Sequence, residues 1–197
     1  MDNVFEKINS IIETDKINSK DEFIDFIECL TNHPDPLREA CAYKLEELFD
    51  EKYVDEYSLN KIINAIVDIN PNVSRAICKL ISEKSYLQDK LSKDIIQKIK
   101  NILNEIPKNE TKTNNKSHAK NKLFFSLYWL LEALSYCKIN DEVNEILQYT
   151  IKFSDYTIRE KTAKILSKMV HPDKELLDEI KRDANFYVNF YTNLYKN

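Results

Sequence analysis

Pro36-Leu-Arg-Glu-Ala-Cys-Ala-Tyr-Lys-Leu45 has a close copy later in the chain, Thr157-Ile-Arg-Glu-Lys-Thr-Ala-Lys-Ile-Leu166. Both segments contain an aliphatic residue, Arg, Glu, a small residue, Ala and Leu in the same order. Val73-Ser-Arg-Ala-Ile-Cys-Lys-Leu80 is a looser copy. Asn121-Lys-Leu-Phe-Phe-Ser-Leu127 is looser still and has Lys122 in the basic position. Internal similarity of this kind indicates a repeat architecture.

The spacing of the basic position supports a repeat. Arg38 and Arg75 are 37 residues apart, and so are Lys122 and Arg159. The middle interval is 47 residues, which equals the same period plus a ten-residue polar insert at 108–117. The apolar residues of the Arg75 copy also allow an alignment with the other copies that is shifted by one residue. The insert has no apolar residue, so we expect a mobile, protease-sensitive loop within one helix pair, with a domain linker as the alternative.

The local pattern of the chain is helical. Apolar residues recur at spacings of three and four, as at Phe23, Ile27 and Leu30, and no useful length alternates with period two. Glycine is absent, which disfavours tight hairpins and phosphate-binding loops. Helix starts are indicated by the capping box Ser19–Glu22, by Asp35 and Asn70 before proline, and by Asn140 and Asp155. The expected helices lie near 3–14, 20–31, 36–51, 57–69, 71–85, 88–106, 118–137, 141–153, 155–170 and 174–196.

At these residues the sequence resembles the HEAT-repeat family of armadillo-like α-solenoids, whose period is ~40 residues. Asp35-Pro-Leu-Arg38 with Cys41, and Asp155-Tyr-Thr-Ile-Arg159 with Thr162, fit the opening of that family's second helix best. The resemblance implies an all-α, right-handed solenoid of about four antiparallel helix pairs in one domain, 1–197. The expected repeats lie near 20–51, 57–85, 88–137 and 141–170, with capping helices at 3–14 and 174–196.

The same resemblance assigns roles to basic residues. Arg38 and Arg159 would brace neighbouring repeats by pairing with acidic groups or carbonyl oxygens. The second helices would line a concave face, where the basic side chains form a candidate partner-binding set: Arg75, Lys79, Lys120, Lys122, Lys161 and Lys164. The alternative is that these are solvated surface residues without a partner.

Composition restricts the remaining possibilities. The formal net charge of −4 argues weakly against general nucleic-acid binding. The longest apolar runs are too short and mixed to span a bilayer, and the acidic, polar N-terminus is no secretory signal. We read the four cysteines as buried, reduced thiols: Cys29, Cys41, Cys78 and Cys137. We therefore expect a cytoplasmic protein, with a monomer favoured.

Catalytic and metal-binding patterns are missing from the sequence. His33, His118 and His171 have no ligand partner at helical spacing, and motifs that need glycine cannot occur. We therefore expect no cofactor and no enzyme activity. Trp129 lies among other aromatic residues, which is more typical of a core than of a base-stacking platform.

The C-terminal stretch Asn185-Phe-Tyr-Val-Asn-Phe-Tyr-Thr-Asn-Leu-Tyr195 is unusually aromatic. One interpretation is a capping helix with Phe186 and Phe190 inward and the tyrosines at the rim. The other is a surface for a partner or for self-association, because tyrosine is favoured in interfaces.

The leading hypothesis is a non-enzymatic adaptor that binds a protein or peptide on its concave face. This step from fold to function is an analogy. The alternative is nucleic-acid binding by the basic residues, as in the DNA glycosylases that share HEAT-like repeats.

Overall fold

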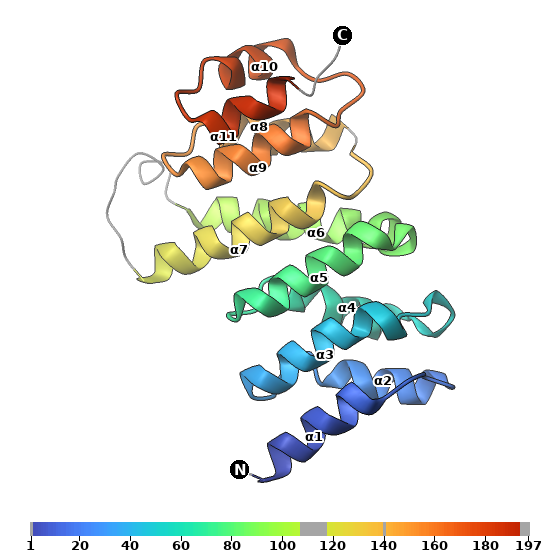
Figure 1. The fold of residues 1–197 in the computed structure, drawn as a ribbon. Helices are drawn as coiled ribbons and strands as arrows, with labels where there is room; N and C mark the ends of the chain where they lie inside the picture. Colours follow the sequence, from blue (N-terminus) through green and yellow to red (C-terminus); the bar gives the residue numbers. More distant parts are fainter. Residues whose placement is uncertain (1, 107–117, 140, 194–197) are drawn as a thin grey trace. The chain divides into compact units, whose positions relative to one another are not determined.

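The computed structural model describes residues 2–106, 118–139 and 141–193. Those residues form helices and turns without any β-strand, which confirms the all-α prediction (Figure 1). The α-helices are α1 (Asp2–Glu13), α2 (Lys20–Glu28), α3 (Asp35–Leu48), α4 (Glu56–Ala65), α5 (Pro71–Glu83), α6 (Ser85–Glu105), α7 (His118–Leu134), α8 (Asn144–Thr150), α9 (Tyr156–Leu166), α10 (Lys174–Lys181) and α11 (Phe186–Asn189). Short 3-10 helices are η1 (Glu51–Tyr53), η3 (Asp141–Val143) and η4 (Phe190–Asn193).

Three predictions lie outside the described part of the chain: the polar loop at 108–117, the cap at Asn140 and the side chain of Lys120. No described helix has the length and apolar character needed to cross a membrane.

The chain divides into two compact units, Met1–Leu91 (unit 1) and Ser92–Asn197 (unit 2), with the boundary inside α6. A single domain over 1–197 stays a prediction. The two units differ in charge. Unit 1 has 19 acidic and 11 basic residues and a formal charge of −8, whereas unit 2 has 14 and 18 and a formal charge of +4.

Unit 1 has two layers of helices. In the first layer α3 packs between α1 and α5, and in the second layer α2 packs against α4 (Figure 1). The side chains that fill the space between the layers are apolar and fully buried, and they include Phe23, Ile27, Leu30, Leu37, Leu45, Ile62, Ile66, Ile77, Leu80 and Ile81. A helix pair cannot bury its apolar face alone, so each pair depends on its neighbour.

Unit 2 has a similar arrangement. Helix α9 packs against α7 on one side and α11 on the other, while α8 packs behind α9 and α10 contacts α11 (Figure 1). Its buried apolar residues include Leu127, Leu130, Leu131, Leu134, Leu147, Phe153, Ile165 and Leu166.

Most helix starts follow the sequence signals. The side chains of Ser19, Asn70 and Asp155 accept hydrogen bonds from first-turn amides, as predicted. The start of α3 differs, because Pro34 occupies the N-cap and no side chain caps the helix. Asp35 instead forms an ion pair with Arg38 at 2.8 Å.

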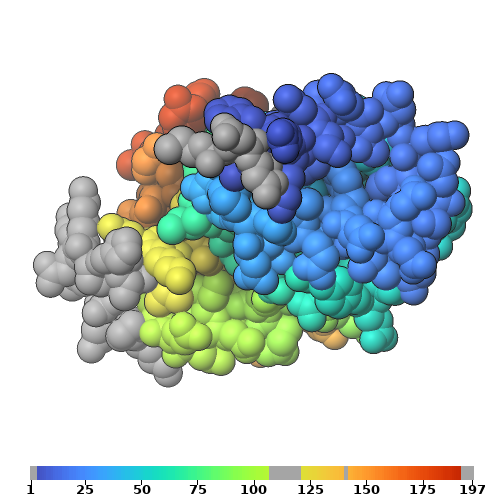
Figure 2. Space-filling view, turned by 90° about the horizontal axis from the view of Figure 1, so that it is seen from below, coloured from blue at the N-terminus to red at the C-terminus, as the bar shows by residue number. Residues whose placement is uncertain are grey.

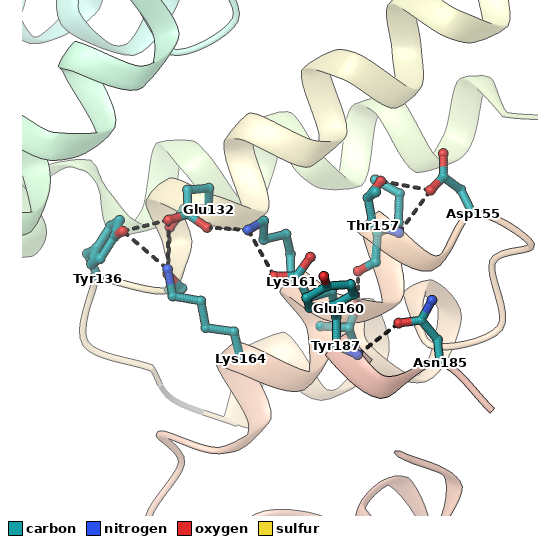
Figure 3. A network of polar contacts seen from close by, with 12 residues as sticks. Glu132, Tyr136, Asp155, Thr157, Glu160, Lys161, Lys164, Asn185 and Tyr187 are labelled. Atoms are coloured by element: carbon teal, nitrogen blue, oxygen red, sulfur yellow. Dashed lines mark hydrogen bonds and ion pairs between the residues drawn. The ribbon is translucent and has the colours of Figure 1, made fainter. Parts of the chain in front are cut away.

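The prediction of one long C-terminal helix at 174–196 is wrong. Helix α10 ends at Lys181, and a new helix starts at Phe186. The break occurs because the backbone amide of Asn185 donates to Asp183 and the Asn185 side chain accepts from the amide of Tyr187 (Figure 3). Asp and Asn side chains compete with the helix in this way and favour caps and turns.

A buried guanidinium ties together the helices of unit 1. Arg38 near the start of α3 donates from Nε and Nη2 to the two carboxylate oxygens of Asp68, at 2.7 and 2.8 Å. Its third nitrogen donates to the backbone carbonyl of His33. The Asp68 carboxylate also accepts from the amide of Asn70, the residue that caps α5. One arginine therefore fixes the α2–α3 turn and the start of α5.

The turn that presents this carbonyl has an unusual backbone. Asn32 lies at φ 60°, in the left-handed region that glycine usually occupies. Asparagine tolerates this region better than most residues, so it substitutes for the glycine that the chain lacks.

Unit 2 repeats the arrangement with different residues. Arg159 donates to both carboxylate oxygens of Asp183, at 2.6 and 3.2 Å, and to the carbonyls of Phe153 and Ser154. Asp183 accepts from the amide of Asn185, which caps α11. We call the sets Arg38–Asp68–Asn70 and Arg159–Asp183–Asn185 the arginine braces. Each arginine thus has a carboxylate and at least one carbonyl oxygen as partners, and its role as a brace between neighbouring repeats stays a prediction.

The Arg75 copy is displaced by one residue. The amides of Arg38 and Arg159 donate to the N-cap carbonyls of their helices, Pro34 and Asp155. In α5 the residue that makes this bond is Ser74, whose amide donates to Asn70. Ser74 is buried and its hydroxyl donates to the carbonyl of Asp68, while Arg75 is exposed. Ser74 therefore occupies the position that Arg38 and Arg159 occupy elsewhere.

We expect Arg38→Lys to lower the free energy of unfolding by about 2 kcal/mol, because an ammonium group cannot make two parallel bonds to Asp68 and a third bond to His33. Chemical denaturation followed by circular dichroism measures the change. The matched control is Lys79→Arg on the surface of α5, which should leave the stability unchanged within error. Equal stabilities for Arg38→Lys and the wild type would contradict the brace.

Candidate partner-binding surface

The predicted binding residues do not belong to one unit. Arg75 and Lys79 lie on α5 in unit 1, whereas Lys122 lies on α7 and Lys161 and Lys164 lie on α9 in unit 2. Arg75 and Lys122 are exposed. Lys79 is also exposed, but its ammonium lies 2.7 Å from Glu46 on the neighbouring helix α3.

Lys161 and Lys164 point into a polar network rather than into open solvent (Figure 3). Glu132 on α7 lies between them, with its carboxylate oxygens 3.1 Å from the Lys161 ammonium and 2.6 Å from that of Lys164. The hydroxyl of Tyr136 donates to Glu132 and lies 3.1 Å from Lys164. Lys161 is 92% buried, with a second acid, Glu160, at 3.5 Å.

Aromatic rings complete the surroundings of these cations. The Lys161 ammonium lies 4.7 Å from the ring centre of Tyr128. The ammonium groups of Lys164 and Lys168 lie 4.4 and 4.9 Å from the ring of Tyr136. Such contacts stabilise a cation that has lost part of its water.

The network shifts the protonation equilibria of its members. Burial alone raises the pKa of Glu132, but the hydrogen bonds from Lys164 and Tyr136 and the charge of Lys161 outweigh it and lower the pKa. Burial opposes the charge of Lys161, yet the attraction of Glu132 raises its pKa. The pKa of Lys168 is lowered by burial and by the nearby charge of Lys164. These charges hold α7 and α9 together, so Lys161 and Lys164 offer little free charge to a partner.

Glu132, the centre of this network, is not among the functional residues predicted from the sequence. The available signal is one acidic residue within the apolar run Leu130–Leu134 on a helix face that is otherwise buried. A buried carboxylate requires cationic or hydrogen-bonding partners. The position of Glu132 therefore predicts that it is paired, but does not identify the residues that pair with it.

A patch of exposed aromatic side chains lies where the α7–α9–α11 layer ends. Phe186 is 67% exposed, Tyr187 60%, Phe190 43% and Tyr156 43%. The rings of Tyr156 on α9 and Tyr187 on α11 stack with centres 6.4 Å apart. We call these four residues the aromatic patch.

The aromatic patch corrects one interpretation of the C-terminal stretch. Phe186 and Phe190 do not point inward, because Val188 takes the buried position of α11. The cap bond between Asn185 and the Tyr187 amide fixes the start of this short helix and with it the direction of the aromatic side chains (Figure 3). Contiguous exposed apolar side chains of this kind mark interaction surfaces.

Unit 1 presents two different surfaces. Its N-terminal helix α1 lies at the surface (Figure 2). Phe5 and Ile12 on this helix are exposed. A groove of about 490 Å³ runs along the C-terminal ends of α3 and α5 and the segment after α1. Five acidic residues and two lysines line this groove, namely Asp15, Glu47, Asp50, Glu51, Glu83, Lys16 and Lys84. The net charge of the groove lining is therefore negative, opposite to that of the predicted basic face.

The cysteines differ from the expectation in one case. Cys41, Cys78 and Cys137 are buried, whereas Cys29 is partly exposed. Among the residues with described positions, no three His, Cys, Asp or Glu side chains gather as a metal site would require.

Comparisons with known proteins found no match: neither a family model, nor a curated protein, nor a solved structure resembles this chain closely enough to be reported. The HEAT-repeat resemblance therefore stays a prediction from the residues.

We expect Glu132→Gln to reduce the free energy of unfolding by about 3 kcal/mol near neutral pH, because it leaves the Lys164 ammonium without its counter-charge and Lys161 with only the more distant Glu160. The folded-state pKa of Glu132 is lowered, so its contribution is present above the unfolded-state pKa of about 4.3 and is lost as the pH falls through the folded-state value. The difference between wild type and variant should therefore shrink in acid.

Denaturation at a series of pH values measures this effect. Glu179→Gln on the exposed face of α10 is the matched control and should show no such trend. A Glu132→Gln difference that stays constant from neutral pH into acid would contradict the charged network.

Proposed function

We propose that the protein is a non-enzymatic adaptor with a HEAT-like α-solenoid fold, and that it binds a protein partner through the aromatic patch on α9 and α11. In this proposal the α1–α3–α5 layer of unit 1 and the α7–α9–α11 layer of unit 2 contain the second helices of repeats, and each layer forms the concave side of its own unit.

The repeated arginine brace supports the solenoid. In both units an arginine in the first turns of one helix pairs with an aspartate that lies two residues before the cap of the next helix in the same layer. Two independent helices that happen to pack would have no reason to share this set of bonds. Ser74 at the same position supports a third copy in which the brace is reduced to one hydroxyl.

The aromatic patch is the observation that carries the binding function. Four aromatic side chains, each at least 43% exposed, gather at the end of a layer whose interior is otherwise well packed. Aromatic residues are enriched at the centres of protein interfaces, where they bury large areas with little loss of side-chain freedom. A protein segment with apolar side chains matches this surface.

The nucleic-acid alternative has one observation in its favour, the formal charge of +4 on unit 2. Phosphate binding needs ammonium and guanidinium groups that are free to release counterions. Lys161 and Lys164 are already paired with Glu132, and Lys79 is paired with Glu46. We therefore place the protein partner first.

A photo-crosslinking amino acid tests this proposal in the native cell. Placed at Tyr187, it should give a discrete protein adduct that survives nuclease treatment. The matched control is the same amino acid at Tyr57 on α4, an aromatic residue that is 43% exposed but lies outside the patch. It should give no such adduct.

Phe186→Ser combined with Phe190→Ser should abolish the adduct formed at Tyr187, because the apolar anchors of the contact are removed. Equal adducts from Tyr187 and Tyr57, or none from either, would contradict the aromatic patch as the binding surface. An adduct that nuclease removes would favour the nucleic-acid alternative instead.

A further inference from the structure

Two cysteines of unit 1 converge on one backbone carbonyl. The amide of Cys29, at the C-terminal end of α2, donates to the carbonyl of Phe26 at 3.1 Å. The thiol of Cys41, in the middle of α3, donates to the same oxygen at 3.3 Å. The two residues are therefore neighbours where α2 packs against α3, on either side of one carbonyl oxygen.

The environments of the two thiols differ in the way that thiol oxidation requires. Cys29 is partly exposed, whereas Cys41 is fully buried. The neighbouring Cys41 thiol lowers the pKa of Cys29 to about 7, with a smaller contribution from the charge of Lys7. Burial raises the pKa of Cys41. At neutral pH Cys29 is thus the thiol with substantial thiolate character, and the thiolate is the reactive form.

We propose that Cys29 and Cys41 form a peroxide-oxidisable dithiol, in which Cys29 is attacked first and Cys41 resolves it to a disulfide that links α2 to α3.

The reaction balances in two steps. The Cys29 thiolate attacks one oxygen of hydrogen peroxide, the O–O bond breaks, and after uptake of a proton the products are Cys29 sulfenic acid and water. The Cys41 thiol then attacks the Cys29 sulfur, a sulfur–sulfur bond forms, and the hydroxyl leaves as water with the Cys41 proton. Two thiols and one peroxide give one disulfide and two waters. A dithiol reductant reverses the change by thiol–disulfide exchange.

The other two cysteines are buried elsewhere in the fold. Cys78 lies on α5 in unit 1, and Cys137 follows the end of α7 in unit 2, where its thiol donates to the carbonyl of Ala133. The double variant Cys78→Ser, Cys137→Ser therefore keeps the proposed pair and removes both competitors.

Oxidation of the purified full-length chain by hydrogen peroxide tests the proposal. Trypsin cleaves after Lys20, Arg38 and Lys44, so Cys29 and Cys41 fall on different peptides, 21–38 and 39–44. Mass spectrometry should find these two peptides joined in the wild type and equally in the Cys78→Ser, Cys137→Ser variant. Dithiothreitol should separate them, and oxidation should raise the midpoint of thermal unfolding.

In Cys41→Ser, which lacks the resolving thiol, a sulfenic-acid probe such as dimedone should label Cys29. Wild type should label far less, because the disulfide forms faster than the probe reacts. If Cys41→Ser does not fold, the linked peptides in the wild type still decide the question. Peroxide treatment that leaves both thiols reduced, or that carries Cys29 to the sulfinic acid without any 21–38 and 39–44 link, would overturn the proposal.

Discussion

Each half of this protein depends on an arginine, buried in unit 1 and partly buried in unit 2, whose planar group satisfies several oxygens at once. A helix that starts inside a packed structure brings unpaired backbone groups with it, and they need partners near the helix end. Arg38 and Arg159 pair the preceding carbonyls with an aspartate that in turn holds the cap of the next helix in the layer. Because the carboxylates of Asp68 and Asp183 also accept from Asn70 and Asn185, the relative placement of neighbouring helices is set by hydrogen bonds as well as by apolar packing.

The placement of the candidate surface follows from this layering. A helix inside a layer is covered on both sides, whereas the last helix has one side without a neighbour in its own unit. In unit 2 that helix is α11, and its start is fixed by the Arg159 brace through Asp183 and Asn185. Val188 fills the core, so the rings at 186, 187 and 190 remain on the outside. The interactions that fix the start of α11 beside α9 therefore also leave the aromatic patch on the outside of unit 2.

The sequence predicted the helices well because apolar periodicity and cap residues are local signals. It also predicted acidic or carbonyl partners for Arg38 and Arg159, but not which ones, because Asp68 and Asp183 lie 30 and 24 residues away. The Arg75 copy was assigned one residue too late, because similarity of residue types does not fix the position of a residue within its helix. The helix starts after the Asn70 cap, which places Ser74 at the position of Arg38 and Arg159. Lys161 and Lys164 looked free because a net-charge count cannot show that Glu132 from another helix lies between them. The break before Phe186 was missed because apolar residues occur at helical spacing on both sides of the Asp and Asn that interrupt the helix.

A double-mutant cycle on Arg159 and Asp183 tests the central claim most directly. The free energies of unfolding of the wild type, Arg159→Ala, Asp183→Ala and the double variant give the coupling between the two side chains. If the brace fixes neighbouring helices of the layer, the coupling is about 2 kcal/mol, as for a partly buried bidentate pair, and far larger than that of the exposed pair Lys79 and Glu46. A coupling no larger than that of the surface pair would show that apolar packing alone sets the arrangement and would contradict the account.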